Sequence, residues 1–199
     1  MRIIFIVVII LIGLFIALQI YTSMETQKAE TQVYEVVKTE KEFEIRYYPA
    51  VTMAKIKSSA TTYKELGSSG FKKLAGYIFG GNKDKKQIKM TSPVHMDIGD
   101  SGSSMSFVMP SSYTKNSLPK PNDSEVTIED ALEEHVAAIT FGGFASNKNI
   151  KEHTELLETA LKKHHLSYYG DFRYLGYNPP YQLFGRRNEI IVTLNWNSR

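Results

Sequence analysis

Histidine side chains are the first candidates for chemistry, because imidazole can hold a metal ion or transfer a proton near neutral pH. The sequence has five histidines, and no two of them stand in H-E-x-x-H or another metal-ligand spacing. There is no cysteine, which excludes thiolate zinc sites, iron–sulfur clusters and cysteine nucleophiles. His95, at a predicted strand end, is a candidate metal ligand. His153, on an apolar helix face, is better explained as a hydrogen-bonded residue of the core or rim.

Serine and carboxylate groups show no catalytic pattern. Four serines lie in Ser101–Ser106, but none stands in G-x-S-x-G. The acidic residues between Glu125 and Glu134 lie in a strand–turn stretch that is expected to face solvent. General acid–base catalysis needs some carboxyl groups in apolar surroundings, and none are visible there. The sequence therefore disfavours a hydrolase.

Charged residues form two other groups. Glu44 and Arg46 share one face of a strand by the period of two, as do Arg187 and Glu189, and we predict one ion-pair network. The second group is a basic cluster, which is predicted to be a solvated loop, or else to bind an anionic ligand or surface. Its members are Lys72, Lys73, Lys83, Lys85, Lys86 and Lys89. The net charge of +3 is too small to indicate nucleic-acid binding.

The elements that position these groups are short strands and two helices. Strand-like patterns rich in β-branched and aromatic residues cover 33–39, 43–48, 51–57, 88–96, 106–109, 126–128, 135–141 and 190–196. Helical spacing of apolar residues predicts one helix from Thr61 or Thr62 to Ile78, stopped by Gly80–Asn82. A second helix is predicted over 147–164.

The order of these elements repeats. Val51–Ala60 aligns with Val136–Ala145, and each segment predicts a strand, a turn of small residues and the start of a helix. Two such halves would pair around a pseudo-two-fold axis, with their sheets curling together and their helices covering the open side. A groove between the halves is the natural ligand site. Chance similarity of short strands is the alternative.

The N-terminal segment has a different composition from the rest of the chain. Every residue from Ile3 to Leu18 is apolar or glycine, and Gln19 is the first interruption. A helix over Ile3–Ile20 would be roughly 27 Å long, just enough to cross a hydrocarbon layer of about 30 Å. The run is longer than the apolar region of a signal peptide, and no convincing small-x-small cleavage site follows it, which favours an uncleaved anchor over a cleaved signal.

Three regions follow from this composition. Residues 1–21 are predicted to be a membrane anchor, residues 22–32 a short tether, and residues 33–199 the folded domain. Arg2 is the cationic residue before the span, so we expect a single-pass protein whose domain lies on the non-cytoplasmic side.

Several segments, in this order along the chain, resemble the SOUL heme-binding protein family: Tyr34–Val37, Phe43–Tyr48, Phe71–Asn82, Lys89–Val94, Phe107–Pro110, Gly176–Pro180 and Arg186–Glu189. The resemblance extends over about residues 33–195. It implies an α+β fold, a distorted β-barrel of two pseudo-two-fold-related strand–helix–strand repeats with two helices. The apolar composition of residues 3–20 adds a preceding N-terminal transmembrane helix. It also implies non-enzymatic binding of heme or another tetrapyrrole in a shallow apolar groove, without a universal axial ligand.

The resemblance places one wall of this groove on the first helix of the domain and the other after the Pro-Pro turn. The residues expected to line it are Leu66, Ser68, Phe71, Leu74, Ala75, Ile78, Tyr181 and Gln182. Lys72 or Lys73 would pair with porphyrin carboxylates at the rim, and His95 is the candidate axial ligand. Basic residues would be expected where this chain has Ser68, Gly76 and Gln182, so weak or altered ligand binding is an alternative.

We therefore predict a membrane-tethered carrier or buffer of heme or a related tetrapyrrole. The expected partners are this ligand and a membrane contacted through residues 3–20, with no nucleic acid. A first alternative is a binding module for another apolar or cationic small molecule, because related two-fold-repeat folds resemble multidrug-sensing domains. A second is a hydrolase built in the same groove, which no motif supports.

Overall fold

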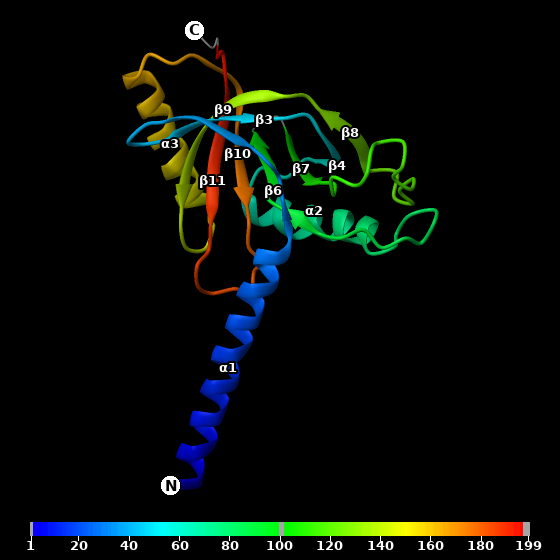
Figure 1. Ribbon diagram of the computed structural model, residues 1–199, viewed down its shortest axis with the longest axis vertical. Helices are drawn as coiled ribbons and strands as arrows, with labels where there is room; N and C mark the ends of the chain where they lie inside the picture. Colours follow the sequence, from blue (N-terminus) through cyan, green and yellow to red (C-terminus); the bar gives the residue numbers. More distant parts are fainter. Residues whose placement is uncertain (1, 100–101, 197–199) are drawn as a thin grey trace.

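A curled antiparallel sheet forms the body of the domain in the computed structural model, which describes residues 2–99 and 102–196. Its strands lie in the order β2-β3-β9-β11-β10-β6-β7-β4-β8 (Figure 1). Their bounds are β2 Glu35–Thr39, β3 Glu44–Tyr48, β4 Val51–Ser58, β6 Val94–Gly99, β7 Gly102–Val108, β8 Thr127–Ala131, β9 Glu134–Phe141, β10 Tyr168–Gly176 and β11 Asn188–Leu194. Two short strands, β1 (Glu30–Thr31) and β5 (Thr91–Ser92), pair in parallel outside this sheet.

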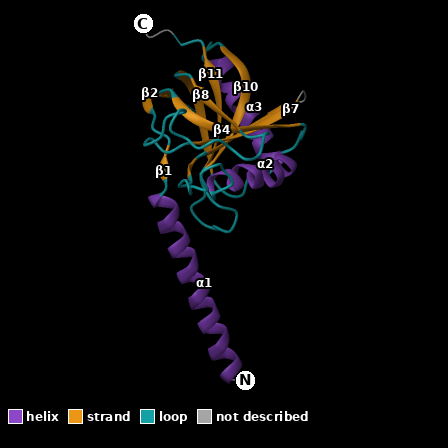
Figure 2. Ribbon diagram, turned by 90° about the vertical axis from the view of Figure 1, so that its right-hand side faces the viewer, coloured by secondary structure: helices purple, strands orange, loops and turns teal. Residues whose placement is uncertain are grey.

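Two of the three helices cover the sheet and the third projects from it. Helix α2 (Tyr63–Ile78) packs on β4, β6 and β7, and α3 (Asn147–Lys163) packs on β9 and β11. Helix α1 (Arg2–Lys28) extends away from the domain as a single shaft (Figures 1 and 2). The fold is thus α+β, with a half-barrel sheet and an apolar N-terminal helix.

Helix α2 shows how the local sequence produces this arrangement. Thr62 has an extended backbone, and its Oγ1 accepts a hydrogen bond from the backbone N–H of Glu65 (3.3 Å), as a helix N-cap does. Gly70 faces β4 so closely that a Cβ there would lie 3.1 Å from Ile56 Cδ1. The absence of a side chain at Gly70 therefore lets α2 approach the sheet.

Every predicted strand overlaps an observed one, and both predicted helices are confirmed. Two strands were missed, β10 and the two-residue β1, which lies in the predicted tether. Gly170 has a positive φ of 72°, and the register shifts between Tyr169 and Arg173, so apolar alternation is interrupted there. Strand β10 is central to the sheet because it pairs with both β6 and β11.

The strand order is symmetric about the β6–β10 pair. On one side lie β7, β4 and β8, and on the other lie β11, β9 and β3, followed at the edge by β2, which has no counterpart. In both halves the strand that precedes the helix, β4 or β9, lies between two antiparallel neighbours. This order is the one a duplicated unit would have, and the duplication itself stays a prediction.

Residues 22–28 of the segment expected to be a tether are helical. Helix α1 continues past residue 21 to Lys28; the hydroxyl of Thr22 donates to the carbonyl of Leu18, and the one hydroxyl proton of Thr26 is shared between the carbonyl of Thr22 and Gln182 Oε1. The chain then enters β1, and the backbone N–H of Gln32 donates to the carbonyl of Ser92 (2.8 Å). No glycine or proline interrupts residues 22–32, so nothing local stops the helix early. The helix is joined to the sheet within a few residues.

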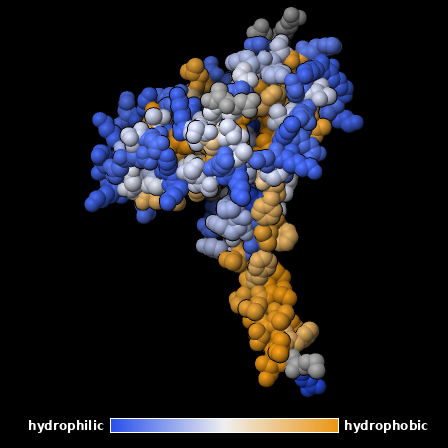
Figure 3. Space-filling model, turned by 180° about the vertical axis from the view of Figure 1, so that it is seen from behind, coloured by the Kyte–Doolittle hydropathy of each residue, from blue (hydrophilic) through white to orange (hydrophobic). Residues whose placement is uncertain are grey.

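Helix α1 is long and apolar enough to cross a membrane, and its apolar window is entirely exposed. A signal sequence would meet the same criteria. Figure 3 shows its apolar surface as a continuous shaft that ends where the helix meets the domain.

The predicted ion-pair network is confirmed, and it is buried. Arg46 Nη1 lies 2.9 Å from Glu189 Oε2, and Arg187 Nη2 lies 2.7 Å from Glu189 Oε1. Arg46 also pairs with Glu44 (2.7 Å). Burial would raise the pKa of Glu189, but the adjacent Arg46 and Arg187 outweigh it and lower that pKa. The network links the neighbouring strands β3, β9 and β11.

Candidate ligand-binding surface

Helix α2 presents the predicted groove residues in two different directions. Leu66, Leu74 and Ile78 are buried in the core against the sheet. Their spacing along the helix turns them toward β4, β6 and β7, and in this structure they support the helix. Their role as groove residues stays a prediction. Ser68 and Phe71 lie on the exposed side, and Ala75 is half-buried.

The exposed side of α2 has an apolar strip with adjacent positive charge. We call Ser68, Phe71, Lys72, Ala75 and Phe79 the α2 outer surface. Phe71 is 39% exposed and Phe79 is 64% exposed, and both are separated from Ala75 by four residues, which places the three on one side of the helix. The Phe71 ring packs edge-on against Phe107 with ring centroids 5.3 Å apart, so its orientation is fixed.

The two candidate rim lysines differ. Lys73 forms a salt bridge with Glu125, so its charge is already neutralised by a neighbour. Lys72 is exposed, and no salt bridge is described for it within 2–99 and 102–196. Lys72 is therefore the better placed of the two to meet an anionic group on the α2 outer surface.

Phe79 was missed by the sequence analysis, which ended the groove at Ile78. The spacing from Phe71 through Ala75 could have identified it. Phe79 follows the last residue of α2, its backbone N–H donates to the carbonyl of Ala75 (2.9 Å), and it forms a β-bridge with Gln87.

The predicted second wall, Tyr181 and Gln182, lies in the loop between β10 and β11. Tyr181 is exposed, but Gln182 is buried. The Gln182 side chain accepts from Thr26 Oγ1 of α1 (2.9 Å) and donates to the carbonyl of Phe184 (3.0 Å). The described side-chain hydrogen bonds of Gln182 are thus made with α1 and its own loop. Its role as a groove wall stays a prediction.

His95 is in a closed position. Its side chain is 6% exposed, and its Nε2 lies 2.7 Å from Gln32 Oε1. Burial, with a smaller contribution from Arg173, lowers the pKa of His95 to about 3. The imidazole is therefore neutral at physiological pH, but an iron atom could reach Nε2 only if Gln32 moved away.

This burial predicts a pH dependence of stability. The unfolded chain binds a proton at His95 below about pH 6.5, whereas the folded chain does not until about pH 3. The contribution of His95 to the free energy of unfolding is therefore fully present above pH 6.5. It falls by up to about 1.4 kcal/mol per pH unit as the pH is lowered toward 3. Urea unfolding of residues 29–199 at pH 7 and 4.5 measures it.

The matched control for this pH effect is His95→Gln, which keeps a polar side chain beside Gln32 but cannot titrate. Wild type is expected to lose more stability than His95→Gln between the two pH values. Equal losses would show that His95 is already accessible to protons in the folded protein.

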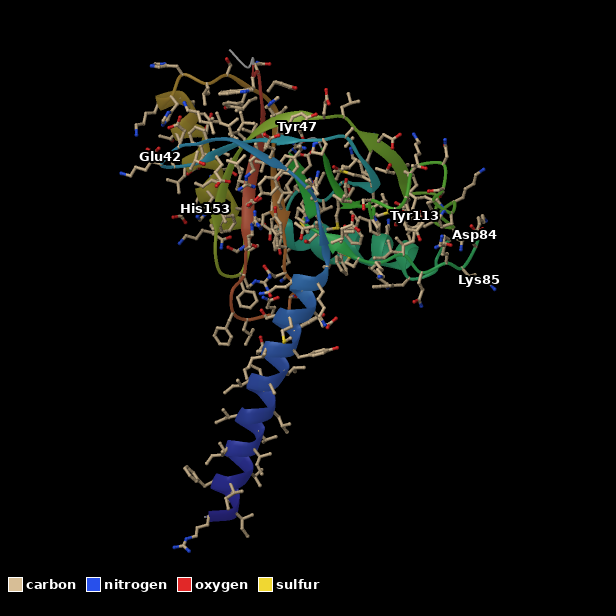
Figure 4. The ribbon with its side chains drawn as sticks, in the orientation of Figure 1. Glu42, Tyr47, Asp84, Lys85, Tyr113 and His153 are labelled. Atoms are coloured by element: carbon tan, nitrogen blue, oxygen red, sulfur yellow. The ribbon has the colours of Figure 1, made fainter. Side chains whose placement is uncertain are left out.

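His153 has the structural role predicted for it. Its ring stacks on Phe141 with centroids 4.0 Å apart, and its Nδ1 donates to the carbonyl of Asn149 (2.7 Å). Figure 4 shows it on α3. Within the described part of the chain, no cluster of three or more histidine or acidic side chains could hold a metal ion.

Two cavities lie elsewhere on the domain. A cavity of about 390 Å³ lies between β1, the start of β4 and the loop after β7, and is lined by apolar residues such as Val33 and Tyr113 together with the carboxylates of Glu30 and Asp130. Tyr113 lies at the end of the domain that carries Asp84 and Lys85 (Figure 4). A second cavity, of about 590 Å³, is lined by lysines, serines and Asp97. The predicted groove residues line neither cavity.

A model of the SOUL heme-binding protein family matches residues 29–193. The chain belongs to this family. The match begins just before β1 and ends within β11, so it includes every strand of the domain.

Relatives with assigned names agree with the family. Heme-binding protein 2 of Mus musculus is 32% identical over 155 residues, which cover 74% of this chain and 76% of the relative. Its Homo sapiens counterpart is 31% identical over the same shares. Heme-binding protein 1 of Xenopus laevis is 30% identical over 161 residues, covering 77% of this chain and 84% of the relative.

Solved structures share the fold at low identity. The EcmrR C-terminal domain has a TM-score of 0.56 and 8% identity, covering 83% of this chain and 99% of that one. A hydrolase from Listeria innocua also has a TM-score of 0.56, with 7% identity, covering 80% and 94%. At such identities the likeness shows the architecture alone.

Proposed function

We propose that this SOUL-family chain is a membrane-tethered, non-enzymatic protein that binds heme or a related tetrapyrrole as a carrier or buffer. One observation carries the proposal: the family match covers the whole sheet, and the relatives at about 30% identity are named heme-binding proteins. The tether is α1, with Arg2 on the cytoplasmic side and the domain on the other side.

The α2 outer surface is the proposed ligand site. A porphyrin is a flat apolar plate with two carboxylates, so it requires aromatic or aliphatic contacts and a cation at one edge. Phe71 and Phe79 supply the apolar contacts, and Lys72 supplies the cation. The site is an open face, which fits weak, reversible binding. Because Gln32 occupies Nε2 of His95, we propose that binding does not require ligation of the iron by His95.

The 390 Å³ cavity suits a different ligand. Its carboxylates, Glu30 and Asp130, would repel porphyrin carboxylates and attract a positive charge, and Tyr113, whose ring already contacts Lys86 Nζ (4.7 Å), supplies an aromatic wall. An apolar cation is therefore the second candidate ligand. Such a cation would raise the thermal unfolding temperature of the protein without producing a heme absorption band. This difference distinguishes it from heme.

Hemin titration of residues 29–199 tests the proposal, with absorption and Trp196 fluorescence as readouts. Phe71→Asp removes apolar contact and adds a negative charge, so we expect the dissociation constant to rise about 10–100-fold, equivalent to about 1.4–2.8 kcal/mol. The matched control is Leu132→Asp, because Leu132 is 83% exposed in the β8–β9 turn, and it is expected to bind hemin as wild type does.

The outcomes are distinct. Absence of a Soret shift with wild-type protein would refute heme binding. Equal affinity of Phe71→Asp and wild type would leave heme binding intact but move the site away from α2. His95→Gln is expected to leave the Soret spectrum of the complex unchanged, and a changed spectrum would restore His95 as the axial ligand.

A further inference from the structure

The loop between β10 and β11 is fastened to the side of α1. Gln19 Nε2 donates to the carbonyl of Tyr181 (3.2 Å), and the backbone N–H of Leu183 donates to Gln19 Oε1 (2.9 Å). A third bond joins Thr26 Oγ1 to Gln182 Oε1 (2.9 Å). Figure 1 shows this loop reaching down beside the helix, below the sheet. Its position along α1 is therefore set by contacts with Gln19 and Thr26.

Gln19 marks a depth within the bilayer that α1 is proposed to span. If Arg2 lies at one edge of a hydrocarbon layer about 30 Å thick, a rise of about 1.5 Å per residue brings the other edge near residue 22. Gln19 then lies within the last turn before that edge. A loop bonded to Gln19 is at the boundary between lipid tails and head groups.

The side-chain amide of Gln19 is hydrogen-bonded, as a polar group in an apolar environment needs to be. An amide without hydrogen-bond partners is strongly disfavoured in hydrocarbon, where no water can replace them. The Gln19 amide donates one of its N–H groups to the loop backbone and accepts a backbone N–H at its oxygen. The loop thus masks the first polar side chain after the apolar run.

The loop presents apolar side chains at this same level. Tyr181 and Leu183 are exposed, and Phe184 is 71% exposed. Aromatic rings project from the loop beside α1 (Figure 4). Arg186 holds the loop in shape, because its Nη1 donates to the carbonyls of Pro179 and Gln182, each at 2.7 Å. Aromatic residues at the lipid–water boundary are a general feature of membrane proteins.

We propose that the β10–β11 loop inserts Tyr181, Leu183 and Phe184 into the interface of the bilayer that α1 spans. This inference rests on the membrane tether of the proposed function. Together with the short connection through β1 and Gln32, the inserted loop holds the domain in one orientation on the membrane. The partner of this surface is the lipid interface itself.

The test uses the full chain in phosphatidylcholine vesicles. Trp196 is the only tryptophan, so Trp196→Phe provides a silent background. Adding Phe184→Trp places a reporter in the loop, and adding Leu132→Trp places one in the β8–β9 turn, at the end of the domain away from α1. Vesicles with brominated acyl chains quench tryptophan only where it reaches the lipid.

With Phe184→Trp, we expect blue-shifted emission and a loss of intensity in brominated vesicles. With Leu132→Trp, emission is expected to be the same in brominated and ordinary vesicles. Flotation of the chain with vesicles, combined with equal emission of Phe184→Trp in both lipids, would overturn loop insertion and leave the tether intact. Failure of the full chain to float with vesicles would overturn the tether and the inserted loop together.

Discussion

Replacing Arg46 by methionine is expected to lower the free energy of unfolding by about 3–5 kcal/mol, the typical loss when one partner of a buried ion pair is removed. Glu189 is fully buried, and its Oε2 accepts from Arg46 Nη1 and from the hydroxyl of Tyr177 (2.8 Å). Without Arg46, the remaining partners of Glu189 leave its charge only partly compensated. Urea unfolding of residues 29–199, followed by Trp196 fluorescence, measures the loss.

Arg187→Met is the matched control for this effect. Arg187 bonds the other carboxylate oxygen of Glu189, but its side chain is partly exposed, so water can replace part of what is lost. We expect a clearly smaller destabilisation than for Arg46→Met. If Arg46→Met and Arg187→Met lowered the free energy of unfolding equally, the burial of Arg46 would not explain the loss. If neither lost any, the network would not contribute to stability.

Asn82→Ala is expected to lower the free energy of unfolding by about 3 kcal/mol, at about 1 kcal/mol for each hydrogen bond lost. Asn82 is almost fully buried, and its Nδ2 donates to the carbonyls of Tyr77 (3.0 Å) and Lys86 (2.7 Å). Its Oδ1 accepts from the backbone N–H of Lys86 (3.0 Å). These bonds close the turn that ends α2. Thermal and urea unfolding would reveal the change.

The control for Asn82 is Asn122→Ala in the neighbouring segment. Asn122 is exposed, and its described bond to this turn is made by its backbone N–H, which donates to the carbonyl of Gly81 (3.1 Å). Its substitution is expected to change stability by less than about 0.5 kcal/mol. A large effect at Asn122, or none at Asn82, would contradict the assignment of these bonds to the Asn82 side chain.

The turn at Asn82 also bears on ligand binding. Phe79 lies between the end of α2 and this turn, and it pairs with Gln87 across it. A variant that loosens the turn would displace Phe79 as well as lower stability. Affinity for hemin should therefore be compared only among variants whose unfolding curves show that they are fully folded at the temperature of titration.

The sequence by itself determined the elements and the network. Apolar periodicity placed both domain helices and all the strands except β1 and β10, because most strands alternate regularly and both helices have apolar faces at helical spacing. The two-residue spacing of Glu44 with Arg46, and of Arg187 with Glu189, was enough to predict their pairing. Family-specific segments predicted the SOUL family, which the match over 29–193 confirms.

Only the tertiary structure decided which side of α2 is available to a ligand. Leu66 and Phe71 are both apolar residues of one helix, and the sequence does not state that the sheet covers the first and leaves the second partly exposed. That depends on the curvature of a sheet assembled from strands far apart in the chain. The same holds for His95, because the residue that closes it off, Gln32, lies 63 positions away.

The connection between helix and domain was also decided by tertiary contacts. Composition alone made residues 22–32 a polar tether, since this segment lacks large apolar residues apart from Met24. In the structure, the β10–β11 loop and β5 supply hydrogen-bond partners for Gln19, Thr26 and Gln32. Local sequence predicts helices and strands because their periods are local, whereas docking depends on partners that only folding brings together.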